Sequence, residues 1–260
     1  MTETITRSGA TIAYSTAGSG NPVCFIGELG LGPWQWSWQF PAVAGPFKAI
    51  IPERRGVGHS ASPSDDYDIK TIRQDILAVL AACDVRRAHF VGFGVGGLIA
   101  LSMAQQTHRV ASLTLIGTAA TRLDRSSATE SHWSPPQPAS VRRRISDEFS
   151  AVFLDSHPDI LSQLVEWRCD EDSVRCDMER QRDAVAAINL ADALYEITAP
   201  SLVIHGTADS AWPIEAGRTL ARDLPKGTFH AIEDAGHFVQ IEAAAPVNDL
   251  LVTTLEEHET

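Results

Sequence analysis

The segment VGFGVGG, residues 91–97, joins an apolar run to a helical pattern through small residues. The apolar run Ala88–Gly92 predicts a buried strand, and the segment from Gly96 to Gln106 predicts a helix. Small residues suit a turn at which a strand and the next helix come very close. The central residue of such a turn is forced to a positive φ, so we expect one at Gly94.

Predicted strands and helices alternate on both sides of this stretch. Before it, the short apolar runs Pro22–Gly27 and Phe47–Glu53 predict buried parallel strands. Ile69–Ala82, which Asp68 can cap, predicts a helix. The other predicted elements are an antiparallel pair of strands at Glu3–Arg7 and Thr11–Thr16, strands at Ser112–Gly117, Ser201–His205 and Thr228–Glu233, and helices at Ile214–Leu224 and from Phe238 onward. This alternation predicts an α/β protein with a mostly parallel eight-stranded sheet and helices on both faces.

The alternation has one long interruption, residues 119–193. It contains the Ser- and Pro-rich stretch HWSPPQPAS, residues 132–140, and then becomes helical and rich in charge. A structureless loop of this length does not suit a compact domain. We therefore expect residues 119–193 to form a helical cap over the carboxyl ends of the strands, inserted into a core of residues 1–118 and 194–260.

Composition excludes several classes of function. The formal net charge of −12 over 260 residues argues against nucleic acid as a partner, because binding phosphates requires a clustered basic face. The opening MTETITRSG is not apolar, and no run approaches the roughly twenty apolar residues of a membrane span. We expect a cytoplasmic protein without membrane association. The cysteines and histidines show no metal-ligand spacing, so we expect no metal. The sequence does not determine the oligomeric state.

Residues 91–97 resemble the nucleophile elbow of the α/β hydrolases, Gly-x-Ser-x-Gly, and three further segments extend the resemblance. ERRGVGHS, residues 53–60, is similar to the family's Asp-x-Arg-Gly-x-Gly-x-Ser segment, with Glu in place of Asp. HGTAD, residues 205–209, and AGHF, residues 235–238, follow predicted strands where the family carries its acid and its histidine. The ordered motifs cover almost the whole chain except the predicted cap, and they imply the α/β-hydrolase fold.

The same glycines allow a second interpretation. Gly92, Gly94 and Gly97 spell G-x-G-x-x-G, the phosphate-binding pattern of dinucleotide-binding folds. That pattern normally belongs to the first βαβ unit, with an acidic residue about twenty positions later. Here it lies in the middle of the predicted sheet, and no acidic residue ends the next strand. We therefore expect no nucleotide and no other cofactor.

The resemblance implies that Asp209 is the catalytic acid and His237 the catalytic base. We expect the two side chains to lie within roughly 2.6–3.2 Å of each other. Taken alone, Asp209 would be interpreted as a turn residue and His237 as the start of a helix. Gly94 stands where the family carries its nucleophile. Because glycine has no side chain, a covalent intermediate through residue 94 is excluded.

The oxyanion region also departs from the family pattern. In FIGELG, residues 25–30, Glu28 stands where the family has its first backbone donor, and the Val95 N–H is the second. We therefore predict an oxyanion hole at Glu28 and Val95. The Glu28 side chain has two interpretations, a loop residue that points to solvent or an unusual acid/base group. We expect Leu29 and Trp34 to line an apolar pocket, with core packing as the alternative for Trp34.

The missing nucleophile leaves three hypotheses. In the first, the His237–Asp209 pair is a general base that acts on water or on a substrate. In the second, the protein is a non-catalytic receptor for a small molecule. In the third, Gly94 is an engineered replacement of serine. The presence of both Asp209 and His237 favours an enzyme of the hydrolase superfamily, and we expect a small, largely apolar substrate such as an ester or lactone.

Overall fold

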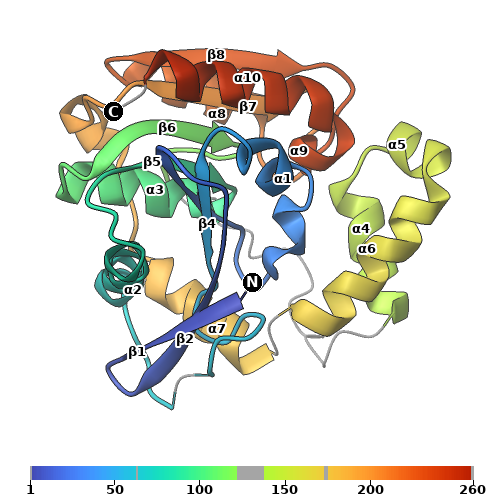
Figure 1. The fold of residues 1–260 in the computed structure, drawn as a ribbon. Helices are drawn as coiled ribbons and strands as arrows, with labels where there is room; N and C mark the ends of the chain where they lie inside the picture. Colours follow the sequence, from blue (N-terminus) through green and yellow to red (C-terminus); the bar gives the residue numbers. More distant parts are fainter. Residues whose placement is uncertain (1, 63, 122–137, 173–174, 259–260) are drawn as a thin grey trace.

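One eight-stranded sheet crosses the molecule, in the strand order β1-β2-β4-β3-β5-β6-β7-β8 (Figure 1). The computed structural model describes residues 2–62, 64–121, 138–172 and 175–258. The strands are β1 (Thr2–Arg7), β2 (Ala10–Ala17), β3 (Pro22–Ile26), β4 (Lys48–Pro52), β5 (Ala88–Phe93), β6 (Val110–Ile116), β7 (Ser201–Gly206) and β8 (Gly227–Ile232). The β1–β2 and β2–β4 pairs are antiparallel and the other pairs are parallel, which confirms the predicted sheet.

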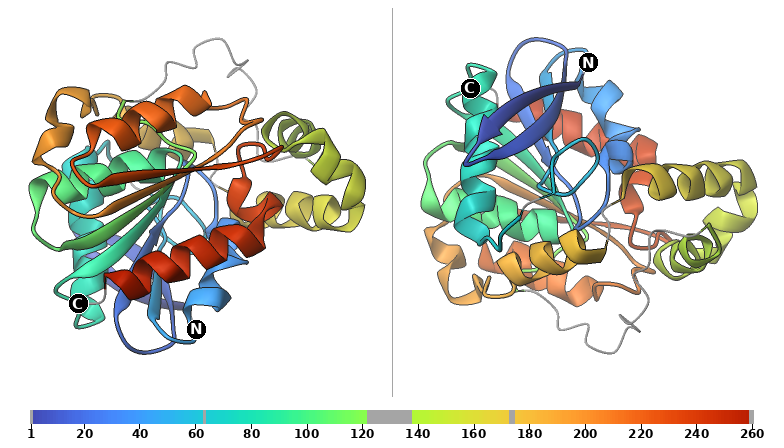
Figure 2. Two further views of the ribbon diagram at one scale, coloured as in Figure 1. Left: turned by 90° about the horizontal axis from the view of Figure 1, so that it is seen from above. Right: turned by 90° about the horizontal axis from the view of Figure 1, so that it is seen from below.

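Helices cover both faces of the sheet (Figure 2). Apolar residues of α2 (Ile69–Ala82), α3 (Val95–Gln106) and α8 (Ile214–Asp223) join one buried cluster. Residues of α1 (Gln39–Val43) and α10 (Ala244–Glu257) join a second cluster on the other face. Because both faces are covered, β5 and β6 are buried along their whole length.

The start of α2 has the predicted cap. The Asp68 carboxylate accepts a hydrogen bond from the Thr71 N–H at 2.9 Å, which satisfies one of the free donors of the first turn. The predicted helix from Phe238 onward is wrong as one element. It is divided into α9 (Val239–Glu242) and α10 at Ala243, which has φ −123° and ψ 49°. Pro246 explains the break, because proline fits the first turn of a helix but cannot donate within one.

The segment between β6 and β7 is helical in its described part, as expected. It contains α4 (Pro138–Glu148), α5 (Ala151–Ser156), α6 (Pro158–Glu171), α7 (Arg175–Val185) and the 3-10 helix η3 (Ala191–Glu196). Helices α4 to α6 lie on the side toward which the arrowheads of β6 and β8 point (Figure 1). The stretch 122–137 lies outside the described residues. The division of the chain into a core and a separate cap stays a prediction.

The strand order sets the place of the site. Strand β5 lies between β3 and β6 in the middle of the sheet. The pairing of Ile26 with Gly92 brings the end of β3 beside the end of β5. Strands β7 and β8 are parallel neighbours, so the loops that follow them also meet at one edge. None of the helices in the described part of the chain is long and apolar enough to span a membrane.

Candidate active site

Asp209 and His237 form a buried pair after neighbouring strands. Asp209 follows β7 and His237 follows β8. His237 Nδ1 lies 2.9 Å from Asp209 Oδ2, which confirms the predicted contact. The side chains are 4% and 0% exposed, respectively. The hydrogen bond to Nδ1 leaves Nε2 as the ring nitrogen that can take a proton from another molecule.

The rest of the Asp209 carboxylate is also occupied. Its Oδ1 accepts hydrogen bonds from the N–H groups of Ala211 at 2.8 Å and Trp212 at 2.9 Å. The buried His205 places Nε2 3.2 Å from Oδ2. Burial acts to raise the pKa of Asp209, but hydrogen bonds from His205 and His237 lower it well below its usual value. These contacts hold the carboxylate in one orientation and keep it ionised.

His205 is a site residue that the sequence interpretation missed. It lies at the end of β7, four residues before Asp209, and Nε2 is also 2.9 Å from the Trp212 carbonyl oxygen. The signal was present in HGTAD, because a histidine that ends a buried strand next to a catalytic loop needs a polar partner. Metal-ligand spacing among the histidines, which this sequence lacks, does not reveal a contact between a histidine and a carboxylate.

The surroundings of His237 increase its basicity. Its backbone N–H donates to the Glu148 carbonyl oxygen at 2.9 Å, and its ring lies 4.7 Å from the ring of Phe93. Burial acts to lower the pKa of His237, but the hydrogen bond and charge of Asp209 outweigh it. The charges of Glu28 and Glu148 add to the increase, so the pKa lies above its ordinary value.

The turn between β5 and α3 has the expected geometry. Gly94 has φ +54° and ψ −122°, which confirms the predicted positive φ. The flanking glycines lie too close to other backbone for any side chain. A Cβ on Gly96 would lie 2.0 Å from the Ile26 carbonyl oxygen, and a Cβ on Gly92 would lie 2.6 Å from Gly97 Cα. The close approach therefore explains the small residues of this turn.

The Glu28 side chain turns inward, so its interpretation as a loop residue that points to solvent is wrong. Glu28 Oε2 accepts a hydrogen bond from the Val95 N–H at 3.0 Å, and Oε1 accepts one from the Leu29 N–H at 2.6 Å. The predicted oxyanion hole also needs correction, because both of its donors have partners. The Glu28 N–H donates to Gln35 Oε1 at 2.8 Å, and the Val95 N–H donates to the Glu28 carboxylate.

Leu29 and Trp34 are buried packing residues in this structure. They are 8% and 3% exposed, respectively. The Trp34 ring stacks on Phe238 at 5.7 Å, and its Nε1 donates to Asp172 of the segment between β6 and β7 at 2.8 Å. Of the two interpretations of Trp34, the structure thus supports packing. The space beside Gly94 contains the Glu28 carboxylate.

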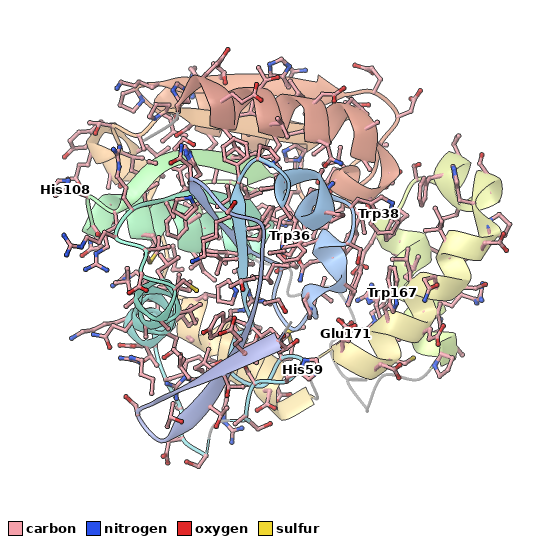
Figure 3. All side chains as sticks on the ribbon, in the orientation of Figure 1. Trp36, Trp38, His59, His108, Trp167 and Glu171 are labelled. Atoms are coloured by element: carbon pink, nitrogen blue, oxygen red, sulfur yellow. The ribbon has the colours of Figure 1, made fainter. Side chains whose placement is uncertain are left out.

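A second tryptophan contact joins the loop after β3 to the helical segment. Figure 3 shows Trp38 and Trp167 near each other, and their rings meet edge to face with centroids 6.1 Å apart. Trp38 follows the 3-10 helix η1 (Pro33–Trp36), and Trp167 belongs to α6. The residue pair between η1 and α1 is therefore in contact with α6.

Two other potential nucleophiles near the end of the strands are engaged or inert. Ser60 Oγ donates to the Glu53 carbonyl oxygen and accepts from the Ala13 N–H, each at 2.8 Å. Cys24 is fully buried, and burial raises the pKa of its thiol far above the usual value. Neither group has the exposure or the activation that a nucleophile requires.

Comparison with known proteins gives consistent matches over the whole chain. Residues 21–244 match the family model described as alpha/beta hydrolase fold. The 2-hydroxymuconate semialdehyde hydrolase of Pseudomonas sp. (strain CF600) is 27% identical over 268 residues, which cover 97% of this chain and 93% of that protein. The 3-oxoadipate enol-lactonase 1 of Acinetobacter baylyi is 27% identical, with 91% of this chain and 90% of that protein covered.

The fold has close structural neighbours. A hydrolase from Pseudomonas aeruginosa superposes with a TM-score of 0.87 over 98% of both chains, at 22% sequence identity. At this identity the likeness concerns the fold, and it agrees with the eight-stranded sheet and its helices.

Proposed function

The chain belongs to the alpha/beta hydrolase fold family, and we propose that it hydrolyses a small, largely apolar molecule with His237 and Asp209 as its general base. The residue at the elbow, Gly94, has no side chain that could attack the substrate. In this proposal the nucleophile that His237 activates is water.

The observation that carries the proposal is the buried 2.9 Å contact between His237 Nδ1 and Asp209 Oδ2. With Nδ1–H directed at the carboxylate, Nε2 of the neutral imidazole accepts a proton from water. The ionised Asp209 then stabilises the imidazolium that forms. The further contacts of Asp209 with Ala211, Trp212 and His205 support this role, because they fix the orientation that a general base needs.

Aromatic residues around His237 support an apolar substrate. Its ring lies against Phe93 and Phe238, and Phe149 stacks on Phe238 with centroids 4.7 Å apart. Such surfaces favour apolar groups, whereas a charged substrate would lose its hydration without a partner. The names of the two relatives describe hydrolysis of small molecules, a semialdehyde and an enol-lactone, and they support the reaction class rather than the apolar character of the substrate.

The hypothesis of an engineered serine replacement fits this site poorly. A Cβ at position 94 would lie 1.9 Å from Glu28 Oε2. A serine at position 94 would therefore require the end of the flexible Glu28 side chain to move. Because the elbow position and the oxyanion loop both differ from the family pattern, natural divergence is favoured over a single engineered change.

His237→Ala tests the proposal on a panel of aryl esters, lactones, epoxides and alkyl halides. Because a general base contributes about 10²–10⁴-fold to a rate, turnover of any substrate that the wild type accepts should fall by that factor. His230→Ala, on the exposed edge strand β8, is the matched control and should keep full activity. Turnover that persists in His237→Ala would refute the general base. Binding without turnover in the wild type would favour the receptor hypothesis.

A further inference from the structure

The Glu28 carboxylate occupies the space that the elbow side chain would fill. An ideal Cβ on Gly94 would lie 1.9 Å from Glu28 Oε2, 2.8 Å from its Cδ and 3.5 Å from its Cγ. The overlap involves the reactive end of the side chain. The Glu28 carboxylate, from the loop after β3, thus lies where a side chain on the turn after β5 would begin.

The carboxylate is held by the two backbone donors nearest to it. Val95 N–H donates to Oε2 at 3.0 Å, and Leu29 N–H donates to Oε1 at 2.6 Å. Each carboxylate oxygen therefore has one backbone donor directed at it. Hydrogen bonds of this kind stabilise negative charge on the oxygen that accepts them.

The loop beneath the carboxylate is fixed by buried side chains. Arg54 donates to the Gly27 carbonyl oxygen at 2.8 Å and also to the Glu28 carbonyl oxygen. Gln35 Oε1 accepts the Glu28 N–H, and Gln35 Nε2 donates to the Gly32 carbonyl oxygen at 2.8 Å. These contacts immobilise the main chain on both sides of Glu28. A fixed main chain places the carboxylate with the precision that catalysis requires.

We propose that Glu28 is the covalent nucleophile of this enzyme and forms a glutamyl ester with its substrate. The inference rests on the proposed function, because His237 must activate the water that cleaves the ester. The two N–H groups are directed at oxygens bonded to Glu28 Cδ. The oxyanion that they can stabilise is therefore one that forms on Glu28 Cδ when hydroxide adds there.

The chemistry of a carboxylate restricts the substrate class. Attack on an ester carbonyl would give an anhydride only by expelling an alkoxide, which is a much poorer leaving group than the carboxylate. Such an adduct reverts to the starting ester. Attack on an sp³ carbon is productive when the leaving group is a weak base or when a strained ring opens. We therefore assign alkyl electrophiles, namely epoxides and alkyl halides, as the substrate class.

The reaction has two chemical steps, formation of the glutamyl ester and its hydrolysis. In the first, a Glu28 carboxylate oxygen attacks the sp³ carbon, the new C–O bond forms and the bond to the leaving group breaks. The electron pair leaves with a halide, or stays on the opened epoxide oxygen, which takes a proton from solvent. In the second, His237 takes a proton from water and hydroxide adds to Glu28 Cδ. The bond from Cδ to the alkoxy oxygen then breaks, and the alcohol leaves with the proton from His237. The carboxyl group loses its remaining proton to solvent.

Trapping the ester with styrene oxide tests the proposal. His237→Ala blocks the second step, so this variant should accumulate one covalent adduct per chain, and peptide mass spectrometry should place it on Glu28. Glu28→Gln combined with His237→Ala should show no adduct. Glu171→Gln combined with His237→Ala is the matched control and should keep the adduct. Glu171 is also a partly buried carboxylate near this loop, and it accepts the Trp34 N–H at 3.2 Å.

The absence of an adduct in His237→Ala, its location on another residue, or its persistence in the Glu28→Gln background would each overturn the proposal. The location of the adduct in His237→Ala decides the matter even if Glu28→Gln does not fold. The results that would refute Glu28 as the nucleophile differ from the results that would refute His237 as the general base. Full turnover in His237→Ala would refute the dyad, whereas a missing adduct with lost turnover would leave the dyad in place and refute Glu28 alone.

Discussion

The side chain of Glu28 and any side chain at position 94 would lie in the same space above the turn after β5. The Glu28 carboxylate lies where a side chain at position 94 would begin, so a larger residue there would require the end of the Glu28 side chain to move. Gly94 can therefore be understood as the residue that makes room for Glu28, and not only as the loss of a nucleophile. The positive φ of Gly94 adds a second reason for glycine, because other residues are strained there.

Gly94→Ser alone should not create a serine hydrolase. The new Cβ would meet Glu28 Oε2, and we expect the free energy of unfolding to fall by about 1–3 kcal/mol from backbone strain alone. Gly94→Ser combined with Glu28→Ala frees both the space and the Val95 N–H, and should react with a serine-directed fluorophosphonate. Gly45→Ser, where an added Cβ meets no atom within 4 Å, is the control for stability. Labelling of Gly94→Ser alone at the rate of the double variant would contradict this account.

The pKa of the His237 ring should depend on the negative charge of Glu28. The pKa of His237 lies above 6.5, with Asp209 as the larger cause and Glu28 as a smaller one. We expect NMR titration of the ring to show a lower pKa in Glu28→Gln, and a larger decrease in Asp209→Asn. In the proposed mechanism the neutral imidazole is the base, so turnover should be lost as the pH falls through this pKa. A pKa that is unchanged by Glu28→Gln would place the carboxylate too far from the ring to act with it.

The sequence predicts some side-chain contacts of the candidate site better than others. The contact of Asp209 with His237 follows from two loops that leave neighbouring parallel strands, so the order of the motifs predicts it. The sequence places the main chain of Glu28 but not its rotamer. The inward direction depends on backbone donors at Leu29 and Val95 that only the folded chain brings together.

The elements of the core could be predicted because their signals are local. The apolar stripe and the Asp68 cap define α2, and the observed bounds agree with the predicted ones. The break between α9 and α10 was missed because the apolar pattern continues through it. The sequence did contain Pro246, which prevents one continuous helix from including both segments.

An ion cluster in the segment between β6 and β7 offers a test at the level of elements. Arg168 of α6 is 1% exposed, pairs with Asp172 at 3.0 Å and also contacts Glu148 at the end of α4. Removing one partner of a buried pair leaves the other charge uncompensated. We therefore expect Arg168→Ala to lower the free energy of unfolding in urea by about 3–5 kcal/mol.

Arg143→Ala, on the exposed face of α4, is the matched control for this loss and should change stability by less than about 0.5 kcal/mol. If Arg168→Ala lowered the free energy of unfolding as little as Arg143→Ala, the ion cluster of Arg168 would not hold α4 against α6. The start of η1 should also be disturbed in Arg168→Ala, because Asp172 accepts hydrogen bonds from Trp34 Nε1 and from the Gly32 N–H.

At the scale of the whole molecule, the parallel sheet is what assembles the site. The loops after β3, β5, β7 and β8 carry Glu28, Gly94, Asp209 and His237, and all four strands end at the same edge. Helices α4 to α6 lie on that side of the molecule (Figure 2). The sequence could predict this gathering from the order of strands and motifs. It could not predict that the Glu28 carboxylate would accept the Val95 N–H or that His205 would approach Asp209, because those contacts depend on side-chain rotamers in the folded chain.

The claim that the Glu28 carboxylate acts in place of an elbow side chain can be tested by a single turnover of styrene oxide in heavy-oxygen water, with excess wild-type enzyme and mass spectrometry of the peptide that contains Glu28. If hydroxide adds to Glu28 Cδ, one heavy oxygen should enter the Glu28 carboxylate, and the diol of this first turnover should contain none. A heavy oxygen in the diol, with Glu28 unlabelled, would mean that water attacks the substrate directly and would contradict the claim.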